Sequence, residues 1–231
     1  MSKKLVEIAE ESARGGFFLF TGNASSLVIL AIGSIIVARL LGPENYGLFS
    51  LSLVVPSIFV GLLDLGVRSA LVRFSAKFRA EGKPQLVAGM LKTGFMFEFI
   101  ISLAVFSATL FSSDPLAALV LKRPEMGFLV KLASPLILLQ TVFMVLNSSF
   151  IGLDRMEGNA LIMNIYTAFK AFLSPLLIIL GFGIAGAIVG HISGYALAGL
   201  AGGLLLIKIY RDLGKPFGNS FLSNPHSRRI R

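Results

Sequence analysis

Long runs of apolar residues without a single charge constrain this chain most. The first run, residues 17–38, has 22 residues and no Asp, Glu, Lys or Arg. A helix needs about 20 mostly apolar residues to cross the hydrocarbon layer of a membrane. Only 14% of the chain is charged and 55% is hydrophobic, whereas soluble domains carry about 25% charged residues. The sequence therefore predicts an integral membrane protein, because a soluble fold of this length could not bury so much apolar surface.

The apolar runs predict an all-α, polytopic membrane protein built as a six-transmembrane-helix bundle. The stretch 159–207 is about twice as long as one span, and the glycines at 181 and 183 divide it into two helices. We expect a cytoplasmic N-terminal segment at 1–14, a six-helix lobe at 15–208 and a basic cytoplasmic tail at 209–231. The expected spans lie near 17–41, 45–66, 93–113, 130–153, 159–180 and 184–207.

The Lys and Arg residues predict the orientation of these spans. Sixteen of the 21 fall on the side of the N-terminus and four on the opposite side. Because short loops rich in Lys and Arg stay in the cytoplasm, we expect a multi-pass protein of the cell membrane with both termini cytoplasmic. This placement accounts for the net charge of +9 through topology and contact with anionic membrane lipids. No nucleic-acid partner is therefore expected.

The basic loop after the second span has a helical pattern of its own. Leu71, Phe74 and Phe78 recur at helical spacing, with Arg73 and Lys77 between them. This pattern predicts a basic amphipathic helix on the inner membrane surface. A plain loop that serves only to orient the protein is the alternative.

The sequence lacks the residue sets that enzymes and metal sites need. It contains no cysteine, and its two histidines, His191 and His226, leave little for a metal centre. No phosphate-binding Gly-rich loop and no Ser/His/Asp set can be assembled from it. We therefore expect no cofactor, no metal and no enzymatic activity.

Three motifs carry a resemblance to a known family: IIVARLLGPENYGLF at 35–49, DLGVRSALVRFSAK at 64–77 and IGLDRMEG at 151–158. Together they resemble the start of prokaryotic polysaccharide transporters of the O-antigen flippase type. Those proteins belong to the multidrug/oligosaccharidyl-lipid/polysaccharide exporter superfamily. The resemblance covers essentially all six expected spans. It implies two six-helix lobes around a cavity that opens to each side in turn and moves a lipid-linked oligosaccharide or polysaccharide precursor across the cytoplasmic membrane.

The chain carries one lobe of that pattern. Because transport cavities of this kind lie between repeats, a single lobe lacks half of its cavity wall. The chain is then a truncated product, an excised half, or a subunit whose other wall comes from a second copy or a companion chain. Two other functions stay open at this point. A multidrug or cation antiporter would have an acidic and aromatic cavity, and a non-transporting membrane scaffold or inactive half would form a closed bundle.

Two ionisable residues lie inside expected spans, and such groups need either a partner or a wet cavity. Lys170 is near the middle of the fifth span, and Glu98 lies in the third. Under the resemblance, Lys170 lines the cavity and attracts the phosphate or pyrophosphate of a lipid-linked sugar. The alternative is a structural ion pair between Lys170 and Glu98. Glu98 could instead exchange protons or bind a coupling cation.

Other charged residues are candidates for gates or salt bridges at the ends of the spans. Asp64 and Arg68 are four residues apart with the acid first, which predicts a local salt bridge or gate contact. Arg39 lies at the outer end of the first span, where snorkelling or contact with a helix C-terminus is expected. A gate pair between Arg39 and Glu44 is the alternative.

Several uncharged positions inside the spans are also informative. Asn23, Asn147 and Asn164 should face the bundle interior, where they could bind sugar hydroxyls or, more commonly, join helices by hydrogen bonds. Glycines occupy every fourth position of 186–194. This repeat predicts a stripe along which two helix backbones approach closely.

Overall fold

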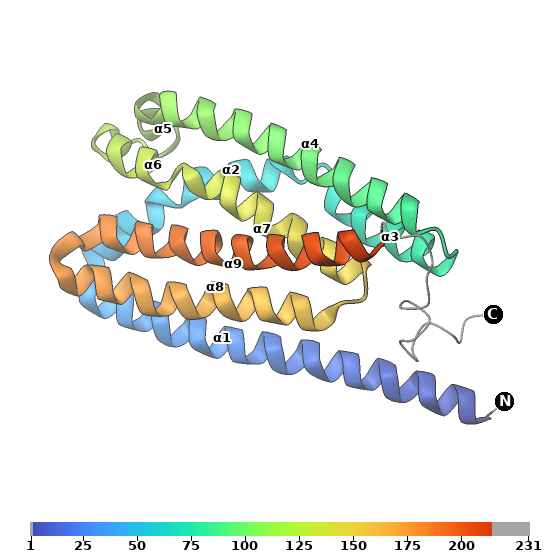
Figure 1. Cartoon of the computed structure of the whole chain (residues 1–231). Helices are drawn as coiled ribbons and strands as arrows, with labels where there is room; N and C mark the ends of the chain where they lie inside the picture. Colours follow the sequence, from blue (N-terminus) through green and yellow to red (C-terminus); the bar gives the residue numbers. More distant parts are fainter. Residues whose placement is uncertain (1, 214–231) are drawn as a thin grey trace.

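The computed structural model describes the backbone of residues 2–213 and the side chains of residues 20–21 and 24–211. Every regular element in this part of the chain is helical, which confirms the all-α class, and the long helices run along one common direction (Figure 1). In chain order the elements are α1 (Ser2–Ser52), α2 (Val54–Leu63), α3 (Val67–Ala80), α4 (Pro84–Phe111), α5 (Ser113–Val120), the 3₁₀-helix η1 (Pro124–Met126), α6 (Gly127–Ala133), α7 (Pro135–Gly152), α8 (Met156–Leu177), the π-helical turn η2 (Ile178–Phe182) and α9 (Gly183–Leu213).

Four segments of the described chain are long and apolar enough to cross a membrane: Ala24–Leu63, Pro84–Phe111, Pro124–Gly152 and Met156–Arg211. The first and last have 40 and 56 residues. Each contains a glycine with positive φ, 75° at Gly42 and 93° at Gly181, a conformation that glycine adopts without steric cost. At both places the chain turns back on itself (Figure 1). The expected count of six spans is therefore not confirmed by helix length and composition, which identify four segments.

Several helices begin or end away from the expected span limits. α1 begins at Ser2 and so includes residues 2–14 of the N-terminal segment that was expected to be separate. α4 begins at Pro84, nine residues before the expected limit at 93, because proline is well placed at the first turn of a helix. Hydropathy marks the apolar part of a helix and not the helix itself. Of the expected tail at 209–231, residues 214–231 lie outside the described part of the chain.

The helices α1, α8 and α9 form the part of the bundle that positions the candidate site. α8 packs most extensively against α9 and α1, and all three lie side by side in Figure 1. A Cβ atom at Gly33 of α1 would lie 2.6 Å from the Cβ of Ala171 in α8. Small residues thus let these helix backbones approach closely, as in other membrane bundles.

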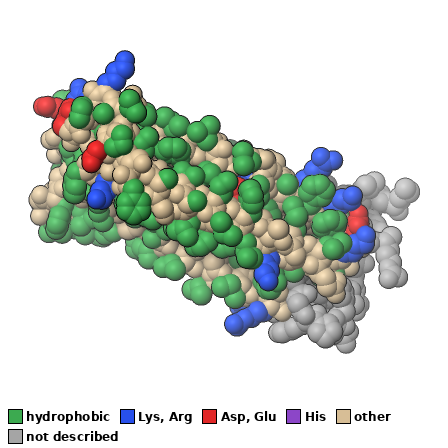
Figure 2. All heavy atoms as spheres, turned by 90° about the horizontal axis from the view of Figure 1, so that it is seen from above, with side chains coloured by type: hydrophobic (Ala, Val, Ile, Leu, Met, Phe, Trp, Pro, Cys, Tyr) green, Lys and Arg blue, Asp and Glu red, His purple; other side chains and the backbone are tan. Residues whose placement is uncertain are grey.

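Large hydrophobic side chains cover much of the protein surface. In Figure 2 they extend over most of the visible face, while Lys and Arg lie mainly toward the two ends. Leu204 is 71% exposed and Phe172 is 67% exposed. Contiguous apolar surface on this scale is not stable in water. It fits a protein whose sides are covered by lipid tails.

The loop after α2 folds as the helix α3, as its spacing predicted. Leu71 and Ser75 are fully buried, whereas Arg73 and Lys77 are exposed. α3 packs against α4 and α7, and the side chain of Leu71 fills the space left by the missing side chain of Gly94 in α4. The buried face of α3 therefore belongs to the bundle. Its position on the inner membrane surface stays a prediction.

Arg79 ties the end of α3 to the loop between α7 and α8. Its guanidinium donates one hydrogen bond to the carbonyl of Leu153 at 2.7 Å and another to the carboxylate of Asp154 at 3.1 Å. We expect Arg79→Gln to lower the free energy of unfolding by about 0.5–1.5 kcal/mol. Both hydrogen bonds are lost, but water can replace them because the site is exposed. Thermal unfolding in detergent, followed by circular dichroism, measures this loss. Arg155→Gln is the control, since exposed Arg155 makes no ion pair within the described residues, and an equal loss in both variants would contradict the prediction.

Candidate functional site

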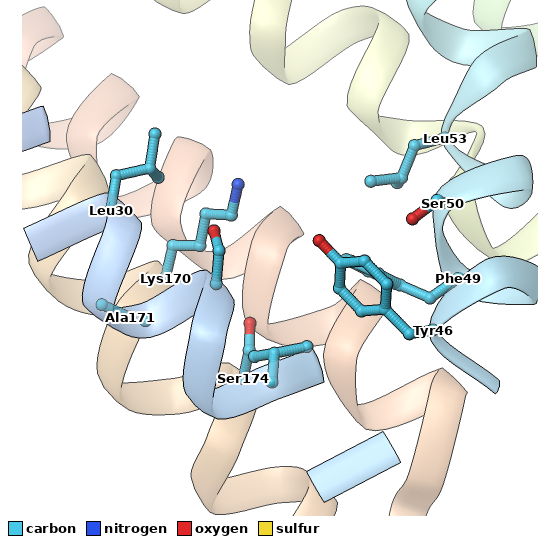
Figure 3. Close-up of a pocket in the computed structure, with 11 residues that line it drawn as sticks. Leu30, Tyr46, Phe49, Ser50, Leu53, Lys170, Ala171 and Ser174 are labelled. Atoms are coloured by element: carbon cyan, nitrogen blue, oxygen red, sulfur yellow. The ribbon is translucent and has the colours of Figure 1, made fainter. Parts of the chain in front are cut away.

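A cavity of about 210 Å³ lies where the two parts of α1 meet α8. The part of α1 before Gly42 forms one wall, the part after Pro43 forms a second, and α8 forms the third. Figure 3 shows the ammonium of Lys170 and the hydroxyl of Tyr46 pointing toward the same open space. The lining residues are Leu30, Gly33, Ser34, Val37, Tyr46, Phe49, Ser50, Leu53, Lys170, Ala171 and Ser174.

Lys170 is the charged residue of this cavity. Its Nζ donates a hydrogen bond to the hydroxyl of Tyr166 at 3.3 Å and lies 5.7 Å from the centre of the same ring. The side chain is half-buried. Among the described residues no carboxylate lies within ion-pair distance of Lys170. The ammonium is therefore fixed by an aromatic neighbour, but its charge is not neutralised by an acid.

The Tyr166 side chain that contacts Lys170 belongs to a cluster of packed aromatic rings. The rings of Tyr166 and Tyr195 stack with centres 4.2 Å apart, and the ring of His191 stacks on Tyr195 at 5.4 Å. Phe143 meets the Tyr195 ring edge-on at 5.3 Å. The Tyr166 hydroxyl is also 3.3 Å from Nε2 of His191. These contacts join α7, α8 and α9 and hold Tyr166 in one position, which in turn orients Lys170.

The glycine repeat of α9 brings that helix close enough for these contacts. A Cβ atom at Gly190 would lie 2.5 Å from the Cα of Ser174, and one at Gly194 would lie 2.9 Å from the carbonyl of Tyr166. Ser174 is buried and donates a hydrogen bond to the carbonyl of Ala187 in α9 at 3.2 Å. The helix-contact stripe predicted from the glycine spacing is thus confirmed.

Glu98 does not pair with Lys170. It is 1% exposed, lies on the face of α4 that packs against α3 and α7, and forms no ion pair within the described residues. The nearest contact of its helix with α3 is that of Gly94 with the Leu71 side chain, one turn from Glu98. The two ionisable residues expected inside the spans therefore belong to separate parts of the bundle, and the structural ion pair between them is not formed.

Comparison with known proteins identifies the family of this chain. Residues 12–229 match the family described as polysaccharide biosynthesis protein. The chain belongs to the polysaccharide biosynthesis protein family. This match confirms the resemblance seen in the sequence motifs. No curated protein matches the chain significantly.

Two solved structures share the fold of this polysaccharide biosynthesis family member. One is an outward-facing multidrug resistance MATE family transporter of the MOP superfamily, with a TM-score of 0.68 and 15% identity over 84% of this chain and 45% of that one. The other is a MOP superfamily transporter from Pyrococcus furiosus whose binding pocket is described as having reverse polarity, suggesting a different function. Its TM-score is 0.73, with 17% identity over 89% of this chain and 48% of that one.

These comparisons identify a membrane transporter fold. Identities of 15% and 17% relate the structures by fold alone. This chain spans about half the length of either structure. The family and the apolar helices fit a multi-pass membrane protein with the fold seen in those transporters.

The gate candidates of this family member have different surroundings. Arg68 and Asp64 form the predicted salt bridge, with Nε and Oδ1 3.2 Å apart. Arg39 and Glu44 are both exposed, and no ion pair joins them within the described part of the chain. The gate pair between these two residues is therefore not formed.

Neither Asn147 nor Asn164 lines the cavity. The side-chain amide of Asn164 accepts a hydrogen bond from Ser25 at 3.2 Å and donates one to the carbonyl of Ala160 at 2.8 Å. It thus joins α8 to α1, which is the more common use that the sequence predicted. Asn147 is half-buried in α7. Asn23 lies in α1, and its side chain is outside the described residues.

Sequence reasoning missed most of the polar residues that surround Lys170. Tyr46, Ser34, Ser50 and Ser174 all line the cavity. Serine and tyrosine are common in membrane helices for reasons of packing, so their residue types gave no signal. Tyr166 could have been found, because it lies four residues before Lys170 and thus on the same face of the helix.

Proposed function

We propose that this chain is one lobe of a flippase that moves a lipid-linked oligosaccharide or polysaccharide precursor across the cytoplasmic membrane. One observation carries the proposal: the half-buried Lys170 faces a cavity and has no carboxylate partner within the described residues. A cation inside a membrane protein is costly unless an anion or water compensates it. The phosphate or pyrophosphate of a lipid-linked sugar is an anion that this function would bring there.

The other cavity residues suit the rest of such a ligand. Ser34, Ser50 and the hydroxyl of Tyr46 offer hydrogen-bonding groups to sugar hydroxyls. Leu30 and Leu53 leave the wall largely apolar. A mostly apolar wall with a few placed polar groups is typical of ligand sites.

Both alternative functions fit this cavity less well. A multidrug or cation antiporter is favoured by the likeness to a MATE family transporter, but its cavity would be acidic, and the charged group here is basic. An inactive closed scaffold would let Lys170 and Glu98 neutralise each other, and no ion pair joins them in the described residues.

We further infer six membrane passes with both termini in the cytoplasm. The chain turns back at Gly42 and at Gly181, which divides each of the two longest apolar segments into two antiparallel parts (Figure 1). Three passes out and three back would bring both ends of the lobe to one side. The bias of Lys and Arg toward that side supports a cytoplasmic location.

A second lobe is part of the proposal. The solved transporters of this fold are about twice as long as this chain, and a cavity between lobes needs both walls. A second lobe, whether in the same polypeptide, in a second copy or in a companion chain, would supply that wall, and membrane lipids would surround the whole.

A binding measurement tests whether this lobe alone recognises the pyrophosphate of the proposed ligand. The purified chain is titrated with a polyprenyl-pyrophosphate oligosaccharide and, separately, with the same lipid lacking the pyrophosphate. We expect the pyrophosphate form to bind roughly tenfold more tightly or better, since charge-assisted hydrogen bonds contribute about 1.5–3 kcal/mol. Equal affinity for the two lipids would contradict the proposal.

Tyr166→Phe tests whether the ring cluster positions Lys170. The substitution keeps the stacked ring but removes the hydroxyl that holds the ammonium. We expect the affinity for the pyrophosphate lipid to fall about 2- to 12-fold, equal to the loss of one hydrogen bond. The thermal transition should fall only modestly, because the hydroxyl also contacts Nε2 of His191 but the ring keeps its stacking. Tyr210→Phe, at an exposed position near the end of α9, is the control and should bind as the wild type does. Unchanged affinity in Tyr166→Phe would show that the hydroxyl does not orient Lys170.

A further inference from the structure

Glu98 is the most isolated ionisable group inside the described bundle. Its side chain is 1% exposed, and neither carboxyl oxygen has a hydrogen-bond partner within the described part of the chain. Burying an ionised carboxylate without hydrogen bonds costs far more than burying the neutral acid. The surroundings of Glu98 in this state of the protein therefore suit a carboxyl group that carries its proton.

The charges around Glu98 come from one corner of the fold. α4 packs mainly against α3 and α7 and also touches α2, α5, α6 and α9. α2 and α7 contain no ionisable residue. The ionisable residues of the described parts of the other elements are Arg68, Arg73, Lys77 and Arg79 of α3, Asp114 of α5, Lys131 of α6, and His191, Tyr195, Lys208, Tyr210 and Arg211 of α9. The Leu71 side chain of α3 contacts the Gly94 position of α4, and in these antiparallel helices Arg68 and Glu98 each lie one turn from that contact, on the same side. Asp64, which follows α2, pairs with Arg68.

The hydrogen-bond donors of the buried Arg68 guanidinium have few strong acceptors. Its side chain is 14% exposed and pairs with Asp64, whose own side chain is 43% exposed. One terminal nitrogen donates to the sulfur of Met144, and the other makes a long bond of 3.4 Å to the carbonyl of Val60. A thioether is a weak acceptor, and a carboxylate is a much stronger one. The guanidinium thus retains donors for which an ionised Glu98 would be the better partner.

We propose that Glu98 is a buried proton-binding site that controls the partner of Arg68. While Glu98 holds its proton, Arg68 pairs with Asp64 at the corner between α2 and α3, as the structure has it. When Glu98 releases its proton, Arg68 turns from the Met144 sulfur to the new carboxylate and loosens its bond to Asp64. The exchange moves one proton between Glu98 and water, and the cation Arg68 compensates the charge that remains.

This site is separate from the cavity around Lys170. Glu98 and Arg68 come from α4 and α3, whereas the cavity is lined by residues of α1 and α8 together with Leu53, which directly follows α1. A test of the proton-binding site at Glu98 therefore does not depend on whether the proposed ligand binds at Lys170. A change in the protonation of Glu98 would affect the corner between α2 and α3, where Arg68 would exchange its ion pair with Asp64 for one with Glu98.

Infrared difference spectroscopy on the reconstituted chain tests whether Glu98 binds and releases a proton. Spectra are taken from about pH 5 to about pH 9, the range in which a buried carboxyl group titrates. We expect a protonated-carboxyl band that disappears as the pH rises and that is absent from Glu98→Gln at every pH. Glu157→Gln, at an exposed position at the start of α8, is the control and should keep the band. A band that survives Glu98→Gln, or one that does not change over this range, would overturn the proposal.

Two further variants test the exchange of partners. Asp64→Asn removes the competing carboxylate, so Arg68 becomes available and the Glu98 band should vanish at a pH lower by about one unit or more. Arg68→Gln removes the compensating cation, so the band should persist to a pH higher by a similar amount. Circular dichroism confirms that each variant is folded. A titration midpoint equal to that of the wild type in both variants would overturn the exchange.

Discussion

Replacing Lys170 by Gln is expected to abolish translocation of a lipid-linked oligosaccharide by the assembled transporter. Lys170 is the charged residue that lines the cavity, and no carboxylate partner holds it within the described residues. Glutamine has a similar length and keeps hydrogen-bonding capacity, but it lacks the charge that an anionic phosphate requires. The loss of a charged hydrogen bond costs about 1.5–3 kcal/mol, or roughly 10- to 150-fold in affinity. A fluorescent substrate in reconstituted vesicles measures the rate.

Two controls separate this effect from general damage. Lys170→Arg keeps the positive charge and should retain part of the translocation rate, although the planar guanidinium cannot reproduce the contacts of an ammonium. Lys131→Gln removes one positive charge at an exposed position of α6 and should translocate as the wild type does. Normal translocation by Lys170→Gln at normal protein levels would remove the basis for the proposed substrate site.

Gly190→Ala is expected to cause the largest loss of stability among single methyl additions to α9. The added carbon would lie 2.5 Å from the backbone nitrogen and Cα of Ser174 in α8. Because backbone atoms cannot rotate away as a side chain can, α8 and α9 must separate. Overpacking of this kind costs about 1–3 kcal/mol, measurable as a lower thermal transition in detergent. Since Lys170 lies one turn before Ser174, affinity for the pyrophosphate lipid should fall as well.

Gly203→Ala provides a matched control on the same helix. No atom lies within 4 Å of the carbon that would be added there. Alanine is the better helix former by about 0.5–1 kcal/mol, so this variant should be as stable as the wild type or slightly more stable. Equal destabilisation by both substitutions would mean that helix conformation, and not the close approach of α8 and α9, accounts for the loss.

The separation of charged sites follows from how the helices pair. Lys170 faces the cavity between α1 and α8, whereas Glu98 is buried in α4, which packs against α3 and α7. In an ion pair, each charge would have cancelled the other. Apart, each retains chemistry of its own: one can attract an anion, and the other can hold a proton.

The predictions from sequence succeeded where local spacing was sufficient. Asp64 and Arg68 are one helical turn apart and form the expected salt bridge. Glycines at every fourth position of α9 contact α8 as predicted. Both patterns depend on the pitch of a helix, which is the same in any fold.

The sequence could not decide between alternatives that depend on the distance between separate helices. A pair between Lys170 and Glu98 was compatible with their depths in two spans, but depth does not say whether two helices are neighbours. The helices of Lys170 and Glu98 pack in different parts of the bundle. The alternative pair of Arg39 and Glu44 is not formed for a different reason: the two residues lie on either side of the turn at Gly42, and both side chains are exposed.

The sequence by itself determined the class of this protein: charge-free apolar runs require lipid, and the motifs at 35–49, 64–77 and 151–158 identify the family. Only the tertiary structure decided which polar residues share a cavity and which charges remain without partners. The physical reason is that hydrophobicity and helical pitch are properties of one segment, whereas a site is made by side chains from several helices. Tyr46 and Lys170, far apart in the chain, face the same space because α1 and α8 pack side by side.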